Sequence, residues 1–431
     1  MVDANQTFVI VGGGLAGAKA AETLRAEGFT GRVILICDER EHPYERPPLS
    51  KGYLTGKEDR DSVFVHEPGW YAQADIELHL GQPAVHLDRA ARTVRLGDGT
   101  CVHYDKLLLA TGAEPRRLDI PGTGLAGVHH LRRLAHAERL RGVLASLGRD
   151  NGHLVIAGAG WIGLEVAAAA RSYGAEVTVV EPEPTPLHPV LGPELGQLFT
   201  DLHSEHGVRF HFGARLTEIT GQDGMVLAAR TDDGEEHPAH AVLAAIGAAP
   251  RTALAEAAGL ALVDRADGGG IAVDASLRTS DPEIFAAGDV AATPLSHFRV
   301  TPWLGTRLRV EHWANALHTG PAAARAMLGR EISYDRVPYF FSDQYDVGLE
   351  YSGYAPPGSY DQVVCRGDVG KREFIAFWLA EGRLLAGMNV NVWDVTETVQ
   401  KLIRSGAPLD PEALADPAVP LDALLPSPAQ S

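Results

Sequence analysis

The 431-residue sequence has few cysteines, a deficit of basic residues and no long hydrophobic run. Its three cysteines, Cys37, Cys101 and Cys365, are too few for a disulfide framework, and none lies in a CxxC pair. Lys and Arg number 38 against 56 Asp and Glu, a formal net charge of −18. That acidic excess argues against nonspecific binding to nucleic acid or to an anionic membrane. No stretch approaches the roughly 18 consecutive apolar residues of a spanning helix.

The opening MVDANQTFVIVGGG also lacks the basic start, the long apolar core and the cleavage site of a signal peptide. With 45% hydrophobic and 22% charged residues, the composition is that of a globular protein. The length suggests about three domains. We therefore expect a cytoplasmic protein that has neither a membrane nor a nucleic acid as partner.

Glycine, by contrast, is abundant, and many of the 47 glycines follow apolar runs. Residues 8–11 (FVIV) predict a buried parallel strand, and the turn Gly12-Gly13-Gly14-Leu15-Ala16-Gly17 follows it. An alanine-rich segment with helical spacing then ends at Gly28, and a second strand over residues 33–36 precedes Asp38. The order is that of a βαβ unit with a GxGxxG turn, which favours a dinucleotide.

The same unit recurs further along the chain. Residues 154–157 lead into Gly158-Ala159-Gly160-Trp161-Ile162-Gly163, a helix and a strand over residues 177–180 that ends at Glu181. In each copy the glycines allow a tight turn, a close approach of pyrophosphate and close packing of helix on strand. Asp38 and Glu181 are each placed to bind an adenosine ribose. A carboxylate at Glu181 favours NADH, because it repels a 2′-phosphate.

Other patterns carry less chemistry. Three histidine pairs or near-pairs, His129-His130, His203/His206 and His237/His240, raise the question of a metal. His203 and His206 are spaced i, i+3 on a predicted helix, but no carboxylate or cysteine ligand set accompanies them, so we predict no metal site. From about residue 334 aromatic residues accumulate and strand-like alternation returns, which predicts a third, α+β domain. We expect an FAD-binding domain over residues 1–115 and 247–331, an NADH-binding domain over residues 116–246 and an interface domain over residues 332–431.

Taken together, these motifs resemble those of the FAD-dependent NADH:ferredoxin reductases of bacterial oxygenase systems. The resemblance runs essentially end to end and includes VIVGGGLAG, RPPLSK ending at Lys51, LLLATGAEPR, GWIGLE ending at Glu165, TSDPEIFAAGD ending at Asp289, RVEHWAN from Arg309, and FSDQ from Phe341. It implies an α/β fold like that of glutathione reductase, with two Rossmann-like dinucleotide-binding domains and a smaller α+β C-terminal domain. It also implies an enzyme that uses FAD and NADH.

The resemblance assigns roles to individual residues. Lys51 is expected beside the flavin N5 and Glu165 beside the nicotinamide, as the catalytic pair. The residues expected to bind FAD are Gly12, Gly14, Ala16, Gly17, Asp38, Glu39, Arg46, Lys51, Val85, Ala110, Gly112, Arg132, Gly288, Asp289 and Trp313. Those expected to bind NADH are Gly158, Gly160, Gly163, Glu165 and Glu181.

The implied function is transfer of electrons from NADH through FAD to a ferredoxin-type iron–sulfur protein, which in turn feeds a cytochrome P450 or a Rieske oxygenase. The loop with Pro47, Pro48 and Ser50 lacks the CxxxxC pair of disulfide-reducing relatives, which argues against that chemistry. Two alternatives stay open: an NADH:quinone or monodehydroascorbate-type reductase, and an NADH-sensing flavoprotein like apoptosis-inducing factor. The oligomeric state, monomer or homodimer, also stays open.

The acidic net charge makes a further demand on such a partner. An acidic ferredoxin would be repelled at long range, so docking predicts a local basic cluster. Candidates are Arg307, Arg309, Lys371 and Arg372.

Overall fold

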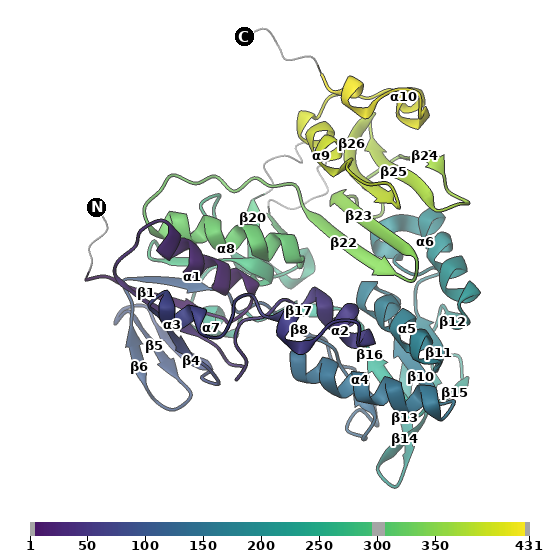
Figure 1. Cartoon of the computed structure of the whole chain (residues 1–431), viewed down its shortest axis with the longest axis horizontal. Coiled ribbons are helices and arrows are strands. Elements are labelled where there is room, and N and C mark those ends of the chain that lie inside the picture. The colour runs from purple at the N-terminus through teal and green to yellow at the C-terminus, as the bar shows by residue number, and fades with distance from the viewer. Residues whose placement is uncertain (1–4, 295–306, 427–431) are drawn as a thin grey trace. The chain divides into compact units, whose positions relative to one another are not determined.

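The computed structural model describes residues 5–294 and 307–426 (Figure 1). The chain divides into two compact units, each assembled from several segments. Unit 1 comprises Met1–Glu45, Val63–Glu114 and Ala249–Phe340, and unit 2 comprises Arg46–Ser62, Pro115–Ala248 and Phe341–Ser431. Two of the crossings lie in β8 (Ala113–Pro115) and β17 (Ala248–Pro250), which form a two-stranded sheet.

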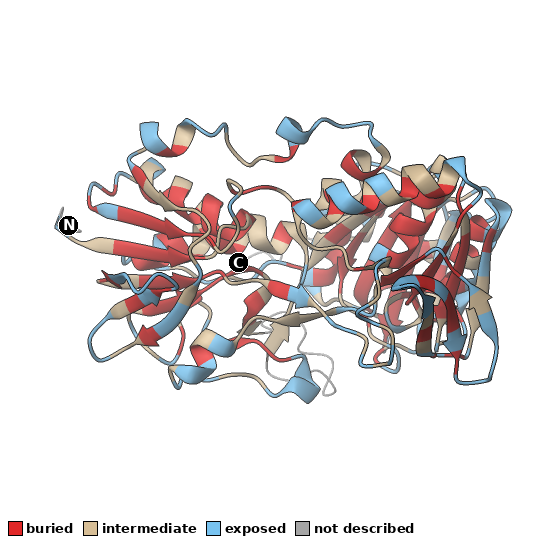
Figure 2. Cartoon of the chain, turned by 90° about the horizontal axis from the view of Figure 1, so that it is seen from below, coloured by how far each residue is buried: buried red, intermediate tan, exposed pale blue. Residues whose placement is uncertain are grey.

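Unit 1 contains a five-stranded, wholly parallel sheet. Its order is β19-β7-β1-β2-β3, with bounds β1 Thr7–Val11, β2 Arg32–Ile36, β3 Ile76–His79, β7 Lys106–Leu109 and β19 Ile284–Ala286. The central strands are runs of Val, Ile, Leu and Phe that are almost fully buried (Figure 2). Such runs are typical of parallel strands covered on both faces.

Two helices of unit 1 cross at small residues. Helix α1 (Leu15–Ala26) packs against α8 (Trp313–Met327). At the crossing, a Cβ added to Gly320 would lie 2.3 Å from the carbonyl oxygen of Ala16. Only glycine at position 320 therefore permits this approach of α8 to the beginning of α1.

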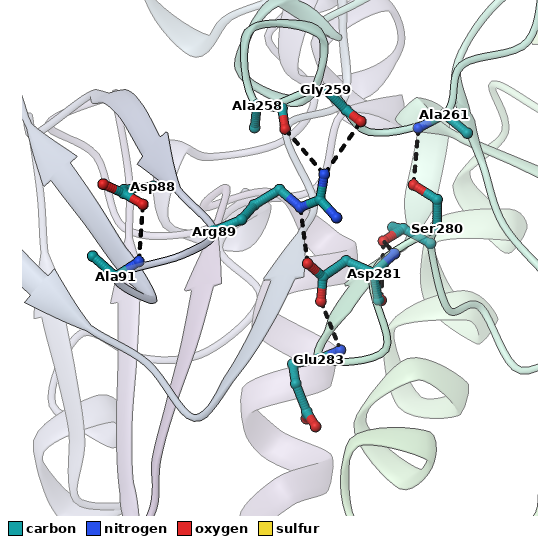
Figure 3. Close-up of polar contacts among 10 residues, drawn as sticks. Asp88, Arg89, Ala91, Ala258, Gly259, Ala261, Ser280, Asp281 and Glu283 are labelled. Carbon is teal, nitrogen blue, oxygen red and sulfur yellow. Dashed lines mark hydrogen bonds and ion pairs between the residues drawn. The ribbon is translucent and has the colours of Figure 1, made fainter.

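Unit 1 also contains a small antiparallel sheet, β4-β5-β6, which Arg89 links to the rest of the unit. The Arg89 guanidinium donates to Asp281 Oδ2 at 2.8 Å and to the carbonyl oxygens of Ala258 and Gly259 at 3.3 Å (Figure 3). Asp281 also accepts the Glu283 N–H, just before β19. The sheet strands are β4 Ala84–Asp88, β5 Thr93–Leu96 and β6 Cys101–His103.

The other elements of unit 1 are short. They are α3 Trp70–Gln73, α7 Ala253–Ala257, η3 Arg265–Asp267, β18 Ile271–Ala272, η4 Gly288–Val290, β20 Ala291–Pro294 and β21 Arg307–Arg309. Strands β18, β20 and β21 form a three-stranded sheet.

Unit 2 repeats the parallel architecture. Its five-stranded sheet has the order β12-β11-β10-β16-β9, all strands parallel. The bounds are β9 Val128–His129, β10 His153–Ala157, β11 Glu176–Glu181, β12 Val208–Phe212 and β16 Ala241–Ala244. Helices α4 Leu134–Arg149, α5 Trp161–Tyr173 and α6 His188–Glu205 belong to this part, and α6 is interrupted at Gly192, whose φ is 75°.

Two further sheets complete unit 2. One is the antiparallel β13-β14-β15, with bounds Leu216–Gln222, Met225–Thr231 and Glu236–Pro238. The other has the order β22-β23-β26-β25-β24, with bounds β22 Tyr339–Gln344, β23 Val347–Gly353, β24 Gln362–Asp368, β25 Glu373–Ala380 and β26 Arg383–Val390. The remaining elements are η1 Pro47–Ser50, α2 Gly52–Thr55, η2 Arg60–Val63, α9 Thr396–Ser405, α10 Pro411–Ala415 and η5 Leu421–Leu424.

The structure confirms the α/β class with two dinucleotide-type parallel sheets and a C-terminal α+β part. The strands predicted at residues 8–11, 33–36, 154–157 and 177–180 are present as β1, β2, β10 and β11. The three-domain division with its boundaries at residues 115, 246 and 331 stays a prediction. In the part of the chain that the structure describes, no helix is long and apolar enough to cross a membrane.

Candidate functional site

The first glycine turn is shaped by close backbone contacts. Gly12 has a φ of 128°, and a Cβ there would lie 2.0 Å from the Ala110 carbonyl oxygen. A Cβ on Gly17 would lie 2.0 Å from the carbonyl oxygen of Gly12. A Cβ on Gly14 would meet nothing within 4 Å, and no side chain caps the beginning of α1 there. The free N–H groups and the helix dipole at this end suit a pyrophosphate.

The acids that follow β2 are engaged within unit 1. Asp38 forms an ion pair with Arg251 at 3.0 Å, and Glu39 accepts a hydrogen bond from the Tyr44 hydroxyl at 2.7 Å. The preceding Cys37 is buried, and a Cβ added to Gly13 would lie 2.3 Å from its sulfur. Burial, reinforced by the charges of Asp38 and Glu39, raises the pKa of the Cys37 thiol to about 12. This cysteine is therefore held as an unreactive thiol.

The Gly288–Asp289 turn is held against α1. The Gly288 N–H donates to the Thr319 hydroxyl at 2.9 Å, and a Cβ on Gly288 would lie 3.1 Å from that of Ala16. The fold thus brings Asp289 to the beginning of the helix that follows the first glycine turn. Ala16, expected at the cofactor, also packs against this turn, which explains the small side chain.

Four other residues predicted to bind FAD lie in unit 1. Ala110 and Gly112 follow β7, and Gly112 has a φ of 70°. Val85 in β4 is 52% exposed. Trp313 is the first residue of α8, and its indole N–H donates to Glu45 Oε2 at 3.1 Å. The sequence did not single out Glu45, because nothing in its neighbourhood indicates the distant tryptophan.

The second glycine turn has the same geometry in unit 2. A Cβ on Gly158, whose φ is 101°, would lie 2.6 Å from the Ala245 carbonyl oxygen, and one on Gly163 would lie 2.1 Å from that of Gly158. Gly160 faces open space at the uncapped beginning of α5. Both turns therefore fit the pyrophosphate of a dinucleotide.

Glu181 closes this second turn. Its carboxylate accepts the N–H of Ala159 at 2.6 Å and the N–H of Glu183 at 3.0 Å. Among the residues that the structure describes, Glu181 makes no ion pair. The acid at the end of β11 is thus fixed by backbone N–H groups.

The predicted catalytic pair lies together in unit 2. Lys51, between η1 and α2, forms an ion pair with Glu165 in the first turns of α5. Their side chains are only 14% and 5% exposed. The Lys51 ammonium also lies 5.6 Å from the centre of the Phe341 ring, within the range of a cation–π interaction.

Two serines to which the sequence assigned no role bind the carboxylate of the Lys51–Glu165 pair. Ser50 donates to Glu165 Oε2 at 2.5 Å, and Ser342 donates to Glu165 Oε1 at 2.6 Å. A buried ion pair is tolerated when additional hydrogen bonds satisfy the charged groups, and these hydroxyls supply them. Both serines belong to recognisable motifs, PPLSK and FSDQ, but nothing in either motif indicates a shared partner.

The polar chain continues into α6. Gln344 donates to the Ser342 hydroxyl at 3.1 Å and its carbonyl oxygen lies 2.8 Å from His203 Nε2. His203 is fully buried, and burial lowers its pKa to about 4. Asp343, in the same segment, has a raised pKa because it is desolvated; Lys51 opposes this shift and Glu165 adds to it. His203 is thus a neutral core histidine.

The remaining predicted residues are engaged by protein groups. The Arg46 guanidinium donates to the Arg132 carbonyl oxygen at 2.5 Å within unit 2, so these two FAD candidates lie together.

Among the docking candidates, Arg309 is only 10% exposed and pairs with Glu311, and Arg372 pairs with Glu205 at 2.7 Å. Lys371 is 75% exposed. Arg309 therefore offers little charge to a partner, because its guanidinium is used inside unit 1.

Known families match most of the chain. Residues 6–320 match the family described as pyridine nucleotide-disulphide oxidoreductase, and residues 339–425 match the reductase C-terminal family. The chain is 39% identical to rhodocoxin reductase of Rhodococcus erythropolis, over 95% of this chain and 92% of that protein. It is also 39% identical to the ferredoxin–NAD(+) reductase component of the anthranilate 1,2-dioxygenase system of Burkholderia cepacia, over 97% and 99%.

A solved structure gives the same result. The covalent complex of putidaredoxin reductase with putidaredoxin matches with a TM-score of 0.91 and 34% identity, over 98% of each chain. With two glycine turns that fit dinucleotides, these matches establish an oxidoreductase that uses FAD and NADH. The chain belongs to the pyridine nucleotide-disulphide oxidoreductase family, among the ferredoxin reductases of oxygenase systems.

Proposed function

We propose that the protein transfers electrons from NADH through FAD to a ferredoxin-type iron–sulfur protein that feeds a cytochrome P450 or a Rieske oxygenase. The observation that carries this proposal is that a chain with two dinucleotide turns has no thiol placed for redox chemistry. Its three cysteines are all unpaired, and the one beside a glycine turn, Cys37, is held as a thiol. Electrons therefore have no dithiol route out of the protein.

FAD, when bound, accepts two electrons as a hydride and can release them one at a time, which suits a one-electron acceptor. In unit 1 the first glycine turn would hold the FAD pyrophosphate, and Asp38 its ribose, in exchange for the ion pair with Arg251. In unit 2 the second turn would hold NADH, with Glu181 at its ribose. The similarity to ferredoxin reductases over nearly the whole length of both chains supports this assignment.

The chain's own contribution to hydride transfer would come from Lys51 and Glu165. Glu165, bound by Ser50 and Ser342, keeps the Lys51 ammonium in one position. A fixed positive charge costs no reorganisation when charge develops beside it during reaction. We propose that Ser342 acts through Glu165 as a positioning residue, and that the two residues of the pair touch the cofactors.

Acceptor specificity tests the proposal. Anaerobic turnover of the holoenzyme with NADH is measured with putidaredoxin, a Rieske-type ferredoxin of a dioxygenase system, a soluble quinone and ferricyanide. We expect at least one ferredoxin to be reduced at least tenfold faster than the quinone at equal concentration. Faster turnover with quinone would contradict the proposal in favour of a quinone reductase, and uniformly slow turnover in favour of an NADH sensor.

The positioning role is tested separately by variants. Glu165→Gln and Ser342→Ala are each expected to slow flavin reduction by NADH at least tenfold, since a hydrogen bond to a charged group is worth ~1.5 kcal/mol or more. Ser172→Ala, on the same helix α5 but bonded to the Ala169 carbonyl, is the matched control. An unchanged pH profile and rate in Ser342→Ala would contradict the positioning role.

The proposal also places the protein in the cytoplasm and limits its partners to the ferredoxin and its cofactors. The acidic composition and the low cysteine content support both points.

A further inference from the structure

A group of metal-ligating side chains lies on unit 2, apart from the glycine turns and the Lys51–Glu165 pair. His211 is in β12, Glu235 is in the turn after β14, and His237 is in β15. One potential ligand atom from each lies within 4.8 Å of the other two. Among the described residues, this is the only such group of three. The two histidines belong to different sheets and are 26 positions apart, so the sequence pattern did not join them.

The hydrogen bonds of His211 leave one ring nitrogen available. Its Nε2 lies 2.7 Å from Asp233 Oδ2, and its Nδ1 lies 3.7 Å from Glu235 Oε2. If Nε2 carries the proton and donates to Asp233, the lone pair is on Nδ1, directed at Glu235. A carboxylate bonded to the other nitrogen is the usual arrangement around a metal-bound histidine, because it fixes the ring and its tautomer.

Asp233 is itself fixed by the turn. Its Oδ1 accepts hydrogen bonds from the Thr231 hydroxyl at 2.5 Å and from the Glu235 N–H at 3.3 Å. The turn therefore holds the Asp233 carboxylate against the His211 ring and places Glu235 beside the same ring.

His237 supplies the third nitrogen. Its Nε2 is buried and has no hydrogen-bond partner among the described residues. The rings of His211 and His237 are 5.0 Å apart and nearly perpendicular. The nearest cation of β12, Arg209, is bound by Glu176 at 3.0 Å. A buried ring nitrogen without a partner is costly in a folded protein unless a ligand satisfies it.

We propose that His211, Glu235 and His237 form a binding site for a divalent first-row transition metal, with Zn²⁺ as the ion it fits best. Two imidazoles and a carboxylate are a common zinc ligand set, with water in the fourth position. Tetrahedral bonds of about 2.0–2.1 Å place ligand atoms ~3.3–3.4 Å apart. The three ligand atoms lie within 4.8 Å of one another, with 3.7 Å between His211 Nδ1 and Glu235 Oε2, so side-chain rotation must bring them together around the ion. The ion would tie β12 to the β14–β15 turn.

Zinc binding to the untagged, metal-stripped holoflavoprotein tests the proposal. Equilibrium dialysis with elemental analysis should find one Zn²⁺ per chain, and Zn²⁺ should raise the unfolding temperature. His211→Ala, His237→Ala and Glu235→Gln should each weaken binding at least tenfold, since each removes one of three protein ligands. Asp233→Asn should weaken it less, because the ligands remain and only the orientation of His211 is lost.

The matched control is His86→Ala, which removes an exposed histidine in β4 of unit 1. Its affinity and stoichiometry should equal those of the unchanged protein. FAD absorbance and circular dichroism establish that each variant is folded before binding is compared. Wild-type affinity in the folded His211→Ala and His237→Ala variants, or less than one bound Zn²⁺ in the unchanged chain, would overturn the site.

Discussion

The two dinucleotide-type sheets of this protein share their architecture but differ in how the terminal acid is held. The sheet of unit 1 has the order β3-β2-β1-β7-β19 and that of unit 2 the order β12-β11-β10-β16-β9, so four strands correspond in position and in chain order. The fifth differs, because β19 is the last strand of its sheet along the chain and β9 is the first of its own. The third glycine of each motif is equally confined, with a Cβ 2.0 Å or 2.1 Å from a carbonyl oxygen. Asp38, however, pairs with Arg251, whereas Glu181 binds the N–H of Ala159 in its own glycine turn.

The difference shows which features of a nucleotide-binding fold depend on helix–strand packing and which depend on the partners of a single side chain. The glycines are required wherever helix and strand approach this closely, so they recur. The acid at the end of the second strand is not confined in this way, so its contacts differ between the two sheets. The Asp38 ion pair is partly exposed and contributes little stability, which leaves the carboxylate available to a ribose. Glu181 is bound by backbone donors in a charge-assisted hydrogen bond and keeps its place without a ligand.

The largest expected effects come from substitutions that block one of the two glycine turns at a time. Gly17→Ala places a methyl group 2.0 Å from the Gly12 oxygen and should abolish FAD binding, measured by flavin content after purification. Gly163→Ala makes the same clash in unit 2 and should retain FAD while slowing flavin reduction by NADH more than 100-fold. Gly142→Ala, on α4 with nothing within 4 Å, is the control and should change neither. Loss of FAD in Gly163→Ala would show that the two sites are not separable.

A smaller effect concerns the stability of unit 2 in acid. The folded-state pKa of His203, about 4, is below its ordinary value of 6.5, so the fold holds the neutral form. Stability from this group is complete above pH 6.5 and falls as the pH drops towards 4, at up to ~1.4 kcal/mol per pH unit. Urea unfolding of the holoprotein between pH 7 and 4 should show a shallower dependence in His203→Gln. An unchanged slope would contradict a neutral His203, and His86→Gln is the exposed control.

Substitution of Glu181 or Asp38 should show which of the two sheets binds the nicotinamide nucleotide. We expect NADH to be preferred over NADPH at least tenfold, or ~1.4 kcal/mol. Glu181→Gln should narrow that ratio, because it removes the charge but leaves an oxygen for the Ala159 N–H. Asp38→Asn should leave the ratio unchanged. The preference of each variant is measured as the ratio of its kcat/KM values for NADH and NADPH. An equal change in both variants would contradict the assignment of Glu181 to NADH.

The smallest expected effect is that of the cysteines. Replacing Cys37, Cys101 and Cys365 together with serine should leave NADH-to-ferricyanide turnover within about twofold, since no electron passes through a thiol. The buried position of Cys37 should cost some stability, because a hydroxyl is placed against the backbone of Gly13. Lost turnover with FAD still bound would indicate a thiol mechanism.

Much of the candidate site follows from local sequence. Strand, glycine turn, helix and acid are neighbours in the chain, so their spacing alone predicts both βαβ units. The single-residue assignments at Val85 and Trp313 rest on family resemblance and stay predictions. The basic docking cluster shows the limit of such inference, since the sequence does not reveal that Arg309 is bound inside unit 1.

The sequence by itself determined the two dinucleotide folds, because glycine is required where a backbone approach excludes any Cβ. It also excluded dithiol chemistry, because the necessary cysteines are missing. Only the tertiary structure decided which groups surround each charge. Ser50, Ser342 and Lys51 reach Glu165 from segments more than 100 residues away, and His211 meets His237 across two sheets. Charged side chains act over a few ångströms in space, and separation along the chain does not encode that distance.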